Sequence, residues 1–293
     1  MGNIIKKSDV QKIYPVRDTR SHKGQNGRML IIGGSINYFG APILAGLGAL
    51  GSGADLVHLL VPECNFDVSR GFYADFIVKK YPGERINSAT FDAASDFFEK
   101  VDCILIGPGV SENEESLQVI TKIVKNAPCQ IVLDAEAIPA IAQLGLPATG
   151  ENPEDRARKL TITPHRGEMD EITEGSLPDD PFAQNQMVTD FAQKWGVTIL
   201  LKNPHDIIAA PGKPTRTNET GNAGMTVGGS GDVLAGFTAS LIAQHCAPYD
   251  ACQCAAFLYG LAGDNLFNAK GYNFTATDLA LELPYTIKSV IGR

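Results

Sequence analysis

Short apolar segments, each ended by a turn-forming residue, recur along most of this 293-residue chain. The first, at 29–32, runs into Gly33-Gly34-Ser35, and later ones end in the same way at glycine, aspartate, histidine or lysine. Short buried strands with helix-length segments between them are typical of a mostly parallel sheet that helices cover on both faces. We therefore expect an α/β fold, one domain over 1–293, with further strands at 55–61, 103–106, 130–133, 160–163 and 197–201 and a hairpin over 207–217.

The strand ends indicate where a ligand would bind. In open α/β sheets, ligands occupy the crevice beyond the carboxyl ends of the strands. The expected helices, at 41–54, 114–125, 233–243 and from 249 onward, would connect and cover these strands. We expect the polar turns after the strands to meet around one such crevice.

The glycine-rich segment 221–232 is the strongest local signal for chemistry. Glycine backbone turns freely, and the apolar run that follows predicts a buried helix with Ser230 as its N-cap. Free amides at a helix start, together with the helix dipole, attract an anion such as phosphate. Asp232 lies in the first turn, where it would repel phosphate, so it is better placed to take a proton from a hydroxyl at which a phosphoryl group is transferred. Ordinary helix capping explains the same pattern equally well.

Composition excludes some functions. The formal net charge of −8 argues against nucleic-acid binding. The sequence holds no apolar run of membrane-spanning length free of glycine or charge, and the first residues lack the apolar centre of a signal peptide. We expect a cytoplasmic protein.

Two familiar nucleotide motifs are missing. Gly33-Gly34-Ser35 does not continue as the dinucleotide-binding pattern GxGxxG, and no Gly-Lys-Ser/Thr of a P-loop occurs. What remains, a late glycine-rich anion site followed at once by Asp232, resembles the ribokinase-like superfamily. Within it the chain resembles the ADP/ATP-dependent NAD(P)H-hydrate dehydratases, through four stretches in the family's order: 23–42, 107–109, 163–169 and 221–234.

The resemblance implies a three-layer α/β/α ribokinase-like fold with a mostly parallel central sheet, a homo-oligomer, tetrameric in relatives, and no epimerase domain of the kind fused in some relatives. It also implies an activity. The family repairs the (S)-epimer of hydrated NADH or NADPH, using Mg²⁺ and ADP or ATP as phosphoryl donor. The C6 hydroxyl is phosphorylated, and elimination of phosphate restores NAD(P)H.

The same resemblance assigns roles to residues. Asp232 would be the base, and Glu168 would lie near Mg²⁺, acting through water. His165 would contact substrate, although it could instead cap the helix that follows. Substrate would be held by Ala41, Gly109, His165 and Asp232, and the nucleotide by Lys202, Asn203, Pro204, His205, Asp206, Gly229, Ser230 and Gly231.

Several positions depart from the family's pattern, and two other functions compete. The departures are Glu136, Pro139, Asn203, Thr226 and Val227. A small-molecule kinase of the same superfamily, acting on hydroxymethylpyrimidine or hydroxyethylthiazole, would share Asp232 but stop after phosphoryl transfer. A non-catalytic nucleotide sensor is the third possibility, and Asp232 disfavours it because binding alone has no use for a carboxylate beside phosphate.

Overall fold

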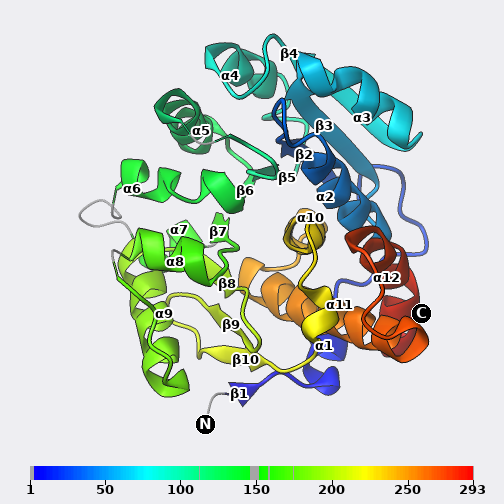
Figure 1. Ribbon diagram of the computed structural model, residues 1–293, viewed down its shortest axis with the longest axis vertical. Helices are drawn as coiled ribbons and strands as arrows, with labels where there is room; N and C mark the ends of the chain where they lie inside the picture. Colours follow the sequence, from blue (N-terminus) through cyan, green and yellow to red (C-terminus); the bar gives the residue numbers. More distant parts are fainter. Residues whose placement is uncertain (1–2, 112, 146–151, 158, 174, 293) are drawn as a thin grey trace.

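A ten-stranded sheet forms the centre of the protein. It is seen in a computed structural model that describes residues 3–111, 113–145, 152–157, 159–173 and 175–292. The strand order is β1-β10-β9-β8-β7-β6-β5-β2-β3-β4, and in Figure 1 the sheet runs from β4 at the top to β1 at the bottom. Strand β9 pairs antiparallel with both β8 and β10, and every other neighbouring pair is parallel. The mostly parallel sheet expected from the sequence is confirmed.

The expected strands fall within a residue or two of their predicted ends. The strands are β1 Asn3–Ile4, β2 Arg28–Ile32, β3 Leu56–Pro62, β4 Phe76–Tyr81, β5 Cys103–Ile106, β6 Gln130–Leu133, β7 Leu160–Ile162, β8 Thr198–Leu201, β9 Asp206–Ala209 and β10 Arg216–Asn218. The α-helices are α1 Lys7–Ile13, α2 Gly40–Gly51, α3 Phe66–Phe72, α4 Ser88–Ser95, α5 Glu114–Asn126, α6 Ala140–Leu144, α7 Pro153–Ala157, α8 Arg166–Ile172, α9 Pro181–Trp195, α10 Ser230–Ala243, α11 Pro248–Lys270 and α12 Ala276–Ile291.

Each buried strand contributes to two hydrophobic cores, because successive side chains point to opposite faces of a sheet. On β2, Met29 and Ile31 join the core beneath α2, α10, α11 and α12, whereas Leu30 and Ile32 join the core beneath α4, α5, α6 and α9. All four side chains are fully buried. Both faces of the sheet are therefore covered, as an unbroken apolar run predicts.

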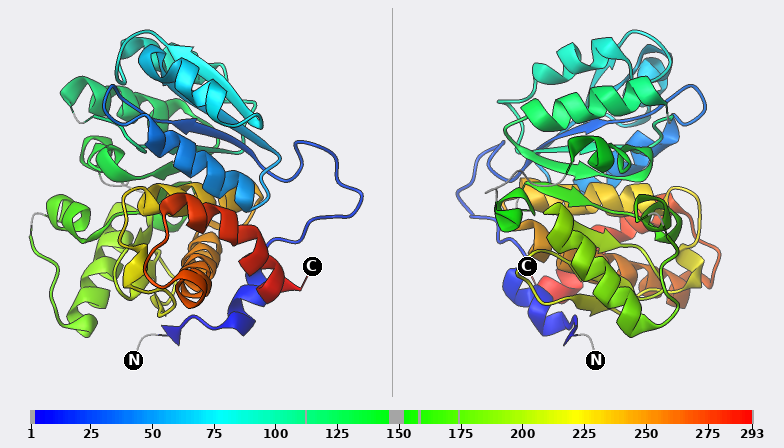
Figure 2. Two further views of the ribbon diagram at one scale, coloured as in Figure 1. Left: turned by 45° about the vertical axis from the view of Figure 1, so that its right-hand side comes forward. Right: turned by 90° about the vertical axis from the view of Figure 1, so that its left-hand side faces the viewer.

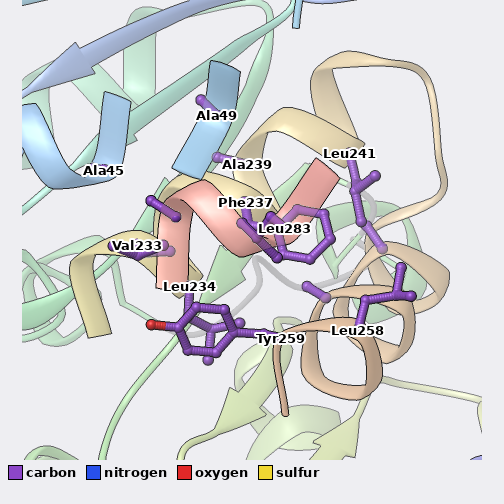
Figure 3. Close-up of a cluster of buried hydrophobic side chains, with 14 of the residues drawn as sticks. Ala45, Ala49, Val233, Leu234, Phe237, Ala239, Leu241, Leu258, Tyr259 and Leu283 are labelled. Carbon is purple, nitrogen blue, oxygen red and sulfur yellow. The ribbon is translucent and has the colours of Figure 1, made fainter. Parts of the chain in front are cut away.

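Helices α2 and α10 are packed backbone to backbone through two glycines. A Cβ atom on Gly236 would lie 1.9 Å from the carbonyl oxygen of Ala45, and one on Gly48 would lie 2.3 Å from that of Val233. The apolar side chains around this contact, including Phe237, fill the space between α10, α11 and α12 (Figure 3). The glycines thus allow a close approach that no larger residue would permit.

The N-cap of α10 is not the residue predicted from the sequence. Ser230 was expected as the N-cap, but Gly229 holds that position, with φ of +88°, and Ser230 is the first helical residue. A backbone with positive φ favours glycine, so the chain turns into the helix at Gly229. The edge strand β4 and helices α3 and α9 were not anticipated, because their mixed exposure gives no continuous apolar run.

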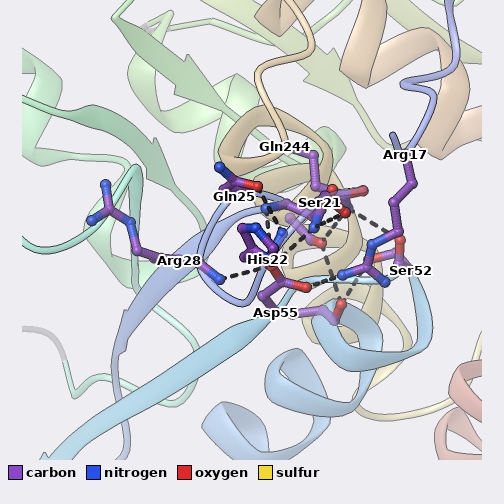
Figure 4. A network of polar contacts seen from close by, with 12 residues as sticks. Arg17, Ser21, His22, Gln25, Arg28, Ser52, Asp55 and Gln244 are labelled. Carbon is purple, nitrogen blue, oxygen red and sulfur yellow. Dashed lines mark hydrogen bonds and ion pairs between the residues drawn. The ribbon is translucent and has the colours of Figure 1, made fainter. Parts of the chain in front are cut away.

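The loop before β2 belongs to the amino ends of the strands. Asp55 accepts hydrogen bonds from the amides of Gly24 (2.9 Å) and Asn26 (3.0 Å) and pairs with Arg17 (Figure 4). This network fixes the loop where β3 begins. The Lys23-Gly24 part of the family pattern therefore lies at the sheet edge opposite the one where ligands bind.

Within the described ranges, no helix combines the length and the apolarity that crossing a bilayer would require.

Candidate active site

The carboxyl ends of the central strands are connected by a series of backbone hydrogen bonds. The residue that follows a strand donates its amide hydrogen to the last carbonyl of the neighbouring strand. Gly107 donates to Ile32 (3.1 Å) and Asp134 donates to Ile106 (3.0 Å) in this way. The amide of Lys202 also donates to the Pro164 carbonyl, at 2.7 Å. Turns far apart in sequence are thus held side by side, as the strand-end pattern predicted.

Lys202 lies among carboxylates at this edge. Its Nζ donates to Asp134 Oδ1 at 2.8 Å and lies 4.0 Å from Glu168 Oε2. Asp134 is almost fully buried, and Thr163 Oγ1 donates to the same oxygen at 2.7 Å. Burial alone would lower the pKa of Lys202, but the carboxylates of Asp134 and Glu168 outweigh it and raise that pKa. Lys202 is therefore a fixed positive charge.

Asp232 occupies the first turn of α10, as predicted. Burial is the main reason why its pKa rises from 3.8 to about 7; the negative charge of Asp134 adds to the effect and Lys202 opposes it. Within the described chain no side chain or amide donates a hydrogen bond to this carboxylate. A half-buried carboxylate with free lone pairs and a pKa close to neutral is suited to act as a general base.

His165 and Glu168 cap the start of α8 in a reciprocal arrangement. The amide of Glu168 donates to His165 Nδ1 at 3.0 Å, and the amide of His165 donates to Glu168 Oε2 at 2.6 Å. The capping role that the sequence left open is therefore present. It does not exclude ligand contact, because His165 is 59% exposed at its side chain and lines the cavity described next.

A cavity of about 790 Å³ opens beside these groups. It brings together most of the residues expected at the nucleotide: Lys202, Asn203, Pro204, Asp206, Ser230 and Gly231. A Cβ atom on Gly231 would lie 3.3 Å from Lys202 Nζ, so the ammonium group lies directly beside the amino end of α10. The Ser230 amide already donates to the Val227 carbonyl at 3.2 Å, whereas the Gly231 amide has no acceptor among the described residues. A cation beside a free amide at a helix start suits a phosphate group.

Two of the residues expected at the nucleotide, His205 and Gly229, do not line this cavity. His205 is exposed and does not line the cavity. Gly229 is turned toward α2, since a Cβ atom there would lie 2.3 Å from Leu44 Cδ1. Asp206 does line the cavity, but both its oxygens are occupied, by the amide of Asn203 (3.1 Å) and by Asn218 Nδ2 (3.0 Å).

Of the residues expected at the substrate, His165 lines this cavity, whereas Ala41 and Gly109 approach each other outside it. A Cβ atom on Gly109, whose φ is +69°, would lie 2.9 Å from Ala41 Cβ and 2.5 Å from the Tyr38 carbonyl oxygen. The turn after β5 therefore touches the start of α2. Larger side chains at either position would fill the space between them.

Two groups that matter here were not assigned from the sequence. Asp134 binds the Lys202 ammonium, and Tyr259 donates from its hydroxyl to the Ser230 carbonyl at 2.7 Å, which ties the amino end of α10 to α11. A signal for Asp134 existed, since it directly follows a buried strand. Tyr259 lies in a helix with no pattern pointing to the site.

Comparisons with known proteins agree on one family. A family model described as NAD(P)H-hydrate dehydratase matches residues 29–285. The ADP-dependent (S)-NAD(P)H-hydrate dehydratase of Cenarchaeum symbiosum is 36% identical over 98% of this chain and 97% of its own length. The bifunctional NAD(P)H-hydrate repair enzyme Nnr of Archaeoglobus fulgidus is 38% identical, but the chain spans only 56% of its length.

A solved structure agrees as well. The ADP/ATP-dependent NAD(P)H-hydrate dehydratase of Bacillus subtilis, co-crystallised with ATP and Mg²⁺, superposes with a TM-score of 0.82 at 25% identity, covering 99% of both chains. The expected three-layer ribokinase-like fold is thereby confirmed.

Proposed function

The chain belongs to the NAD(P)H-hydrate dehydratase family, and from that premise we propose that it dehydrates the (S)-epimer of hydrated NADH or NADPH at the expense of ADP or ATP. The observation that carries the proposal is the position of Asp232. Its unbonded carboxylate occupies the same helical turn as Ser230 and Gly231, which line the 790 Å³ cavity. A base and a phosphate site within one turn are what phosphoryl transfer to a hydroxyl requires.

In the first step Asp232 takes the proton of the C6 hydroxyl as that oxygen attacks the terminal phosphorus of the nucleotide. Lys202 and the amide of Gly231 offset the negative charge on the transferred group. The bond from phosphorus to the leaving nucleotide breaks, so that ADP would yield AMP.

The second step needs no further donor. The ring nitrogen pushes its electron pair toward C6 and expels phosphate, and loss of a proton from C5 restores the dihydropyridine. A kinase of the same fold would stop before this step. It is the weaker alternative, because both the family model and the full-length relative carry dehydratase names.

We also propose that Mg²⁺ accompanies the nucleotide. Glu168 fits a contact through water better than a direct one, since its Oε2 already accepts from His165 and faces Lys202. In the described ranges no three acidic, histidine or cysteine side chains come together as a metal site. Mg²⁺ that is held by phosphates, water and one carboxylate is a common arrangement, and it would supply positive charge at the phosphates.

Association into a homo-oligomer, a tetramer by family resemblance, is part of the proposal. Apolar side chains are exposed on α3 and on the edge strand β4, among them Phe72 (53%) and Ile77 (40%). An exposed apolar sheet edge favours association. Light scattering after size exclusion would give the assembly's mass.

The decisive experiment mixes the protein with hydrated NADH, Mg²⁺ and either ADP or ATP, and follows absorbance in the dihydronicotinamide band. A nucleotide-dependent rise is expected, and the active donor identifies the preferred nucleotide. The variant Asp232→Asn should lose the rise while still binding ADP in calorimetry. If folded wild-type protein gives no rise with verified substrate, the dehydratase proposal is wrong and acceptors for a kinase should be screened.

A further inference from the structure

A second cavity, of about 460 Å³, lies at the same edge of the sheet as the active site. It is lined by Ile36, Asn37, Glu84, Arg85, Asn87 and Ser111. These residues come from the turns after β2, β4 and β5, toward the upper end of the molecule in Figure 1, whereas the first cavity lies beside β8 and β9 toward the lower end. Asp232 lies in the first turn of α10, and this helix lies between the two ends (Figure 1).

The second cavity adjoins the substrate side of the active site. The turn that holds Ile36 and Asn37 continues through Tyr38, whose carbonyl oxygen lies 2.5 Å from a Cβ position on Gly109. The amide of Ile36 also donates to the Glu84 carbonyl at 3.0 Å, which joins this turn to the one after β4. A ligand whose reactive ring lies at Ala41 and Gly109 could therefore extend into this cavity.

Two charged side chains, those of Glu84 and Arg85, line the cavity. Among the described residues, no ion pair or side-chain hydrogen bond engages the Arg85 guanidinium or the Glu84 carboxylate. Asn87 differs, since its amide nitrogen donates to two carbonyls and its oxygen caps α4. Ile36 is 54% exposed and adds an apolar surface. A free cation, a free carboxylate and an apolar surface in one hollow suit a nucleoside that bears phosphate.

Building on the proposed function, we propose that this cavity binds the adenosine half of the hydrated cofactor, and that Glu84 and Arg85 read its ribose. A carboxylate accepts a hydrogen bond from the free 2′-hydroxyl of an NADH-type ribose, and an arginine pairs with the 2′-phosphate of an NADPH-type ribose. Adjacent residues of opposite charge would thus favour opposite substrates.

The test compares Arg85→Gln, Glu84→Gln and the control Arg20→Gln, whose side chain is 89% exposed on the loop before β2. For Arg85→Gln, KM for hydrated NADPH should rise about tenfold, the loss expected when one charged contact to phosphate is removed. KM for hydrated NADH, KM for the donor nucleotide and kcat should change by less than about twofold. Glu84→Gln should do the reverse, raising KM for hydrated NADH and lowering it for hydrated NADPH. Arg20→Gln should change neither the KM for hydrated NADH nor the KM for hydrated NADPH.

Binding of the products gives a readout that does not depend on turnover. Calorimetry with NADPH and with NADH, in the presence of ADP, should show the same selective losses in each variant, with unfolding midpoints like that of the wild type. Equal effects on both substrates, or a change only in donor KM, would overturn the assignment of the cavity. An inactive wild type that still shows selective binding would instead reject the proposed function and leave the cavity's role standing.

Discussion

Replacing Asp232 with asparagine should abolish turnover and yet make the protein more stable. The carboxylate is half-buried among other carboxylates, which raises its pKa from 3.8 to about 7. Between these values the folded chain holds a proton that the unfolded chain releases, so stability falls as pH rises through this window and the full cost is present above pH 7. At 1.36 kcal/mol per pH unit, this pKa difference corresponds to a loss of about 4 kcal/mol in the free energy of unfolding. Solvent screens the charge at the open side of the site, so we expect a loss of about 2 kcal/mol.

Urea unfolding of Asp232→Asn and wild type at about pH 5 and about pH 8 tests this reasoning. The variant's gain should be larger at the higher pH, because asparagine carries no charge at either. Asp75→Asn is the matched control, since Asp75 is exposed between α3 and β4. A variant no more stable than wild type at the higher pH, or a gain of equal size at both, would refute the claim that the charged base is costly to bury.

Three further outcomes are expected. Turnover should rise with pH and reach half its maximum near pH 7, where Asp232 ionises; a rate that is flat between about pH 5 and about pH 8 would contradict the base assignment. Lys202→Met should move that midpoint to higher pH, because Lys202 lowers the pKa of Asp232, and calorimetry should show weaker ADP binding; an unmoved midpoint would mean that the two charges do not interact. Gly236→Ala should destabilise the fold by about 1–3 kcal/mol in thermal or urea unfolding, because the added methyl meets the Ala45 carbonyl. Gly71→Ala, in α3 with open space around it, should not destabilise.

The sequence predicted the buried strands well because a strand that is covered on both faces consists of a nearly continuous apolar run. All four residues at 103–106 and three of the four at 130–133 are apolar, and the strands have those bounds. The edge strand β4 was missed because only its first and last residues, Phe76 and Tyr81, are buried, and because it lies beside only one neighbour. A short segment with neither a continuous apolar run nor regular alternation is a weak signal.

For the candidate site, the sequence located the turns that carry polar residues, but not the contacts between residues of different turns. Asp232 was predicted to be the base because it comes directly after the last glycine of the segment 221–232, which is a local feature. The Lys202 contact to Asp134 joins residues 68 positions apart, and no spacing rule reports such a pair. His205 is exposed and does not line the cavity that Lys202, Pro204 and Asp206 line, because sequence adjacency does not show which way a side chain turns.

The glycine contact between α2 and α10 limits how much the distance between these two helices can vary. Ala41 lies in the first turn of α2 and Asp232 in the first turn of α10, and the two helices meet at Gly48 and Gly236 with main chain against main chain. The spacing between Ala41, which we propose as part of the substrate site, and Asp232, the proposed base, is therefore set by peptide groups and not by side chains that can change rotamer. Thermal motion of side chains would change this distance little. Catalysis requires reacting groups to be placed to within well under about 1 Å, so a spacing fixed by the main chain favours it.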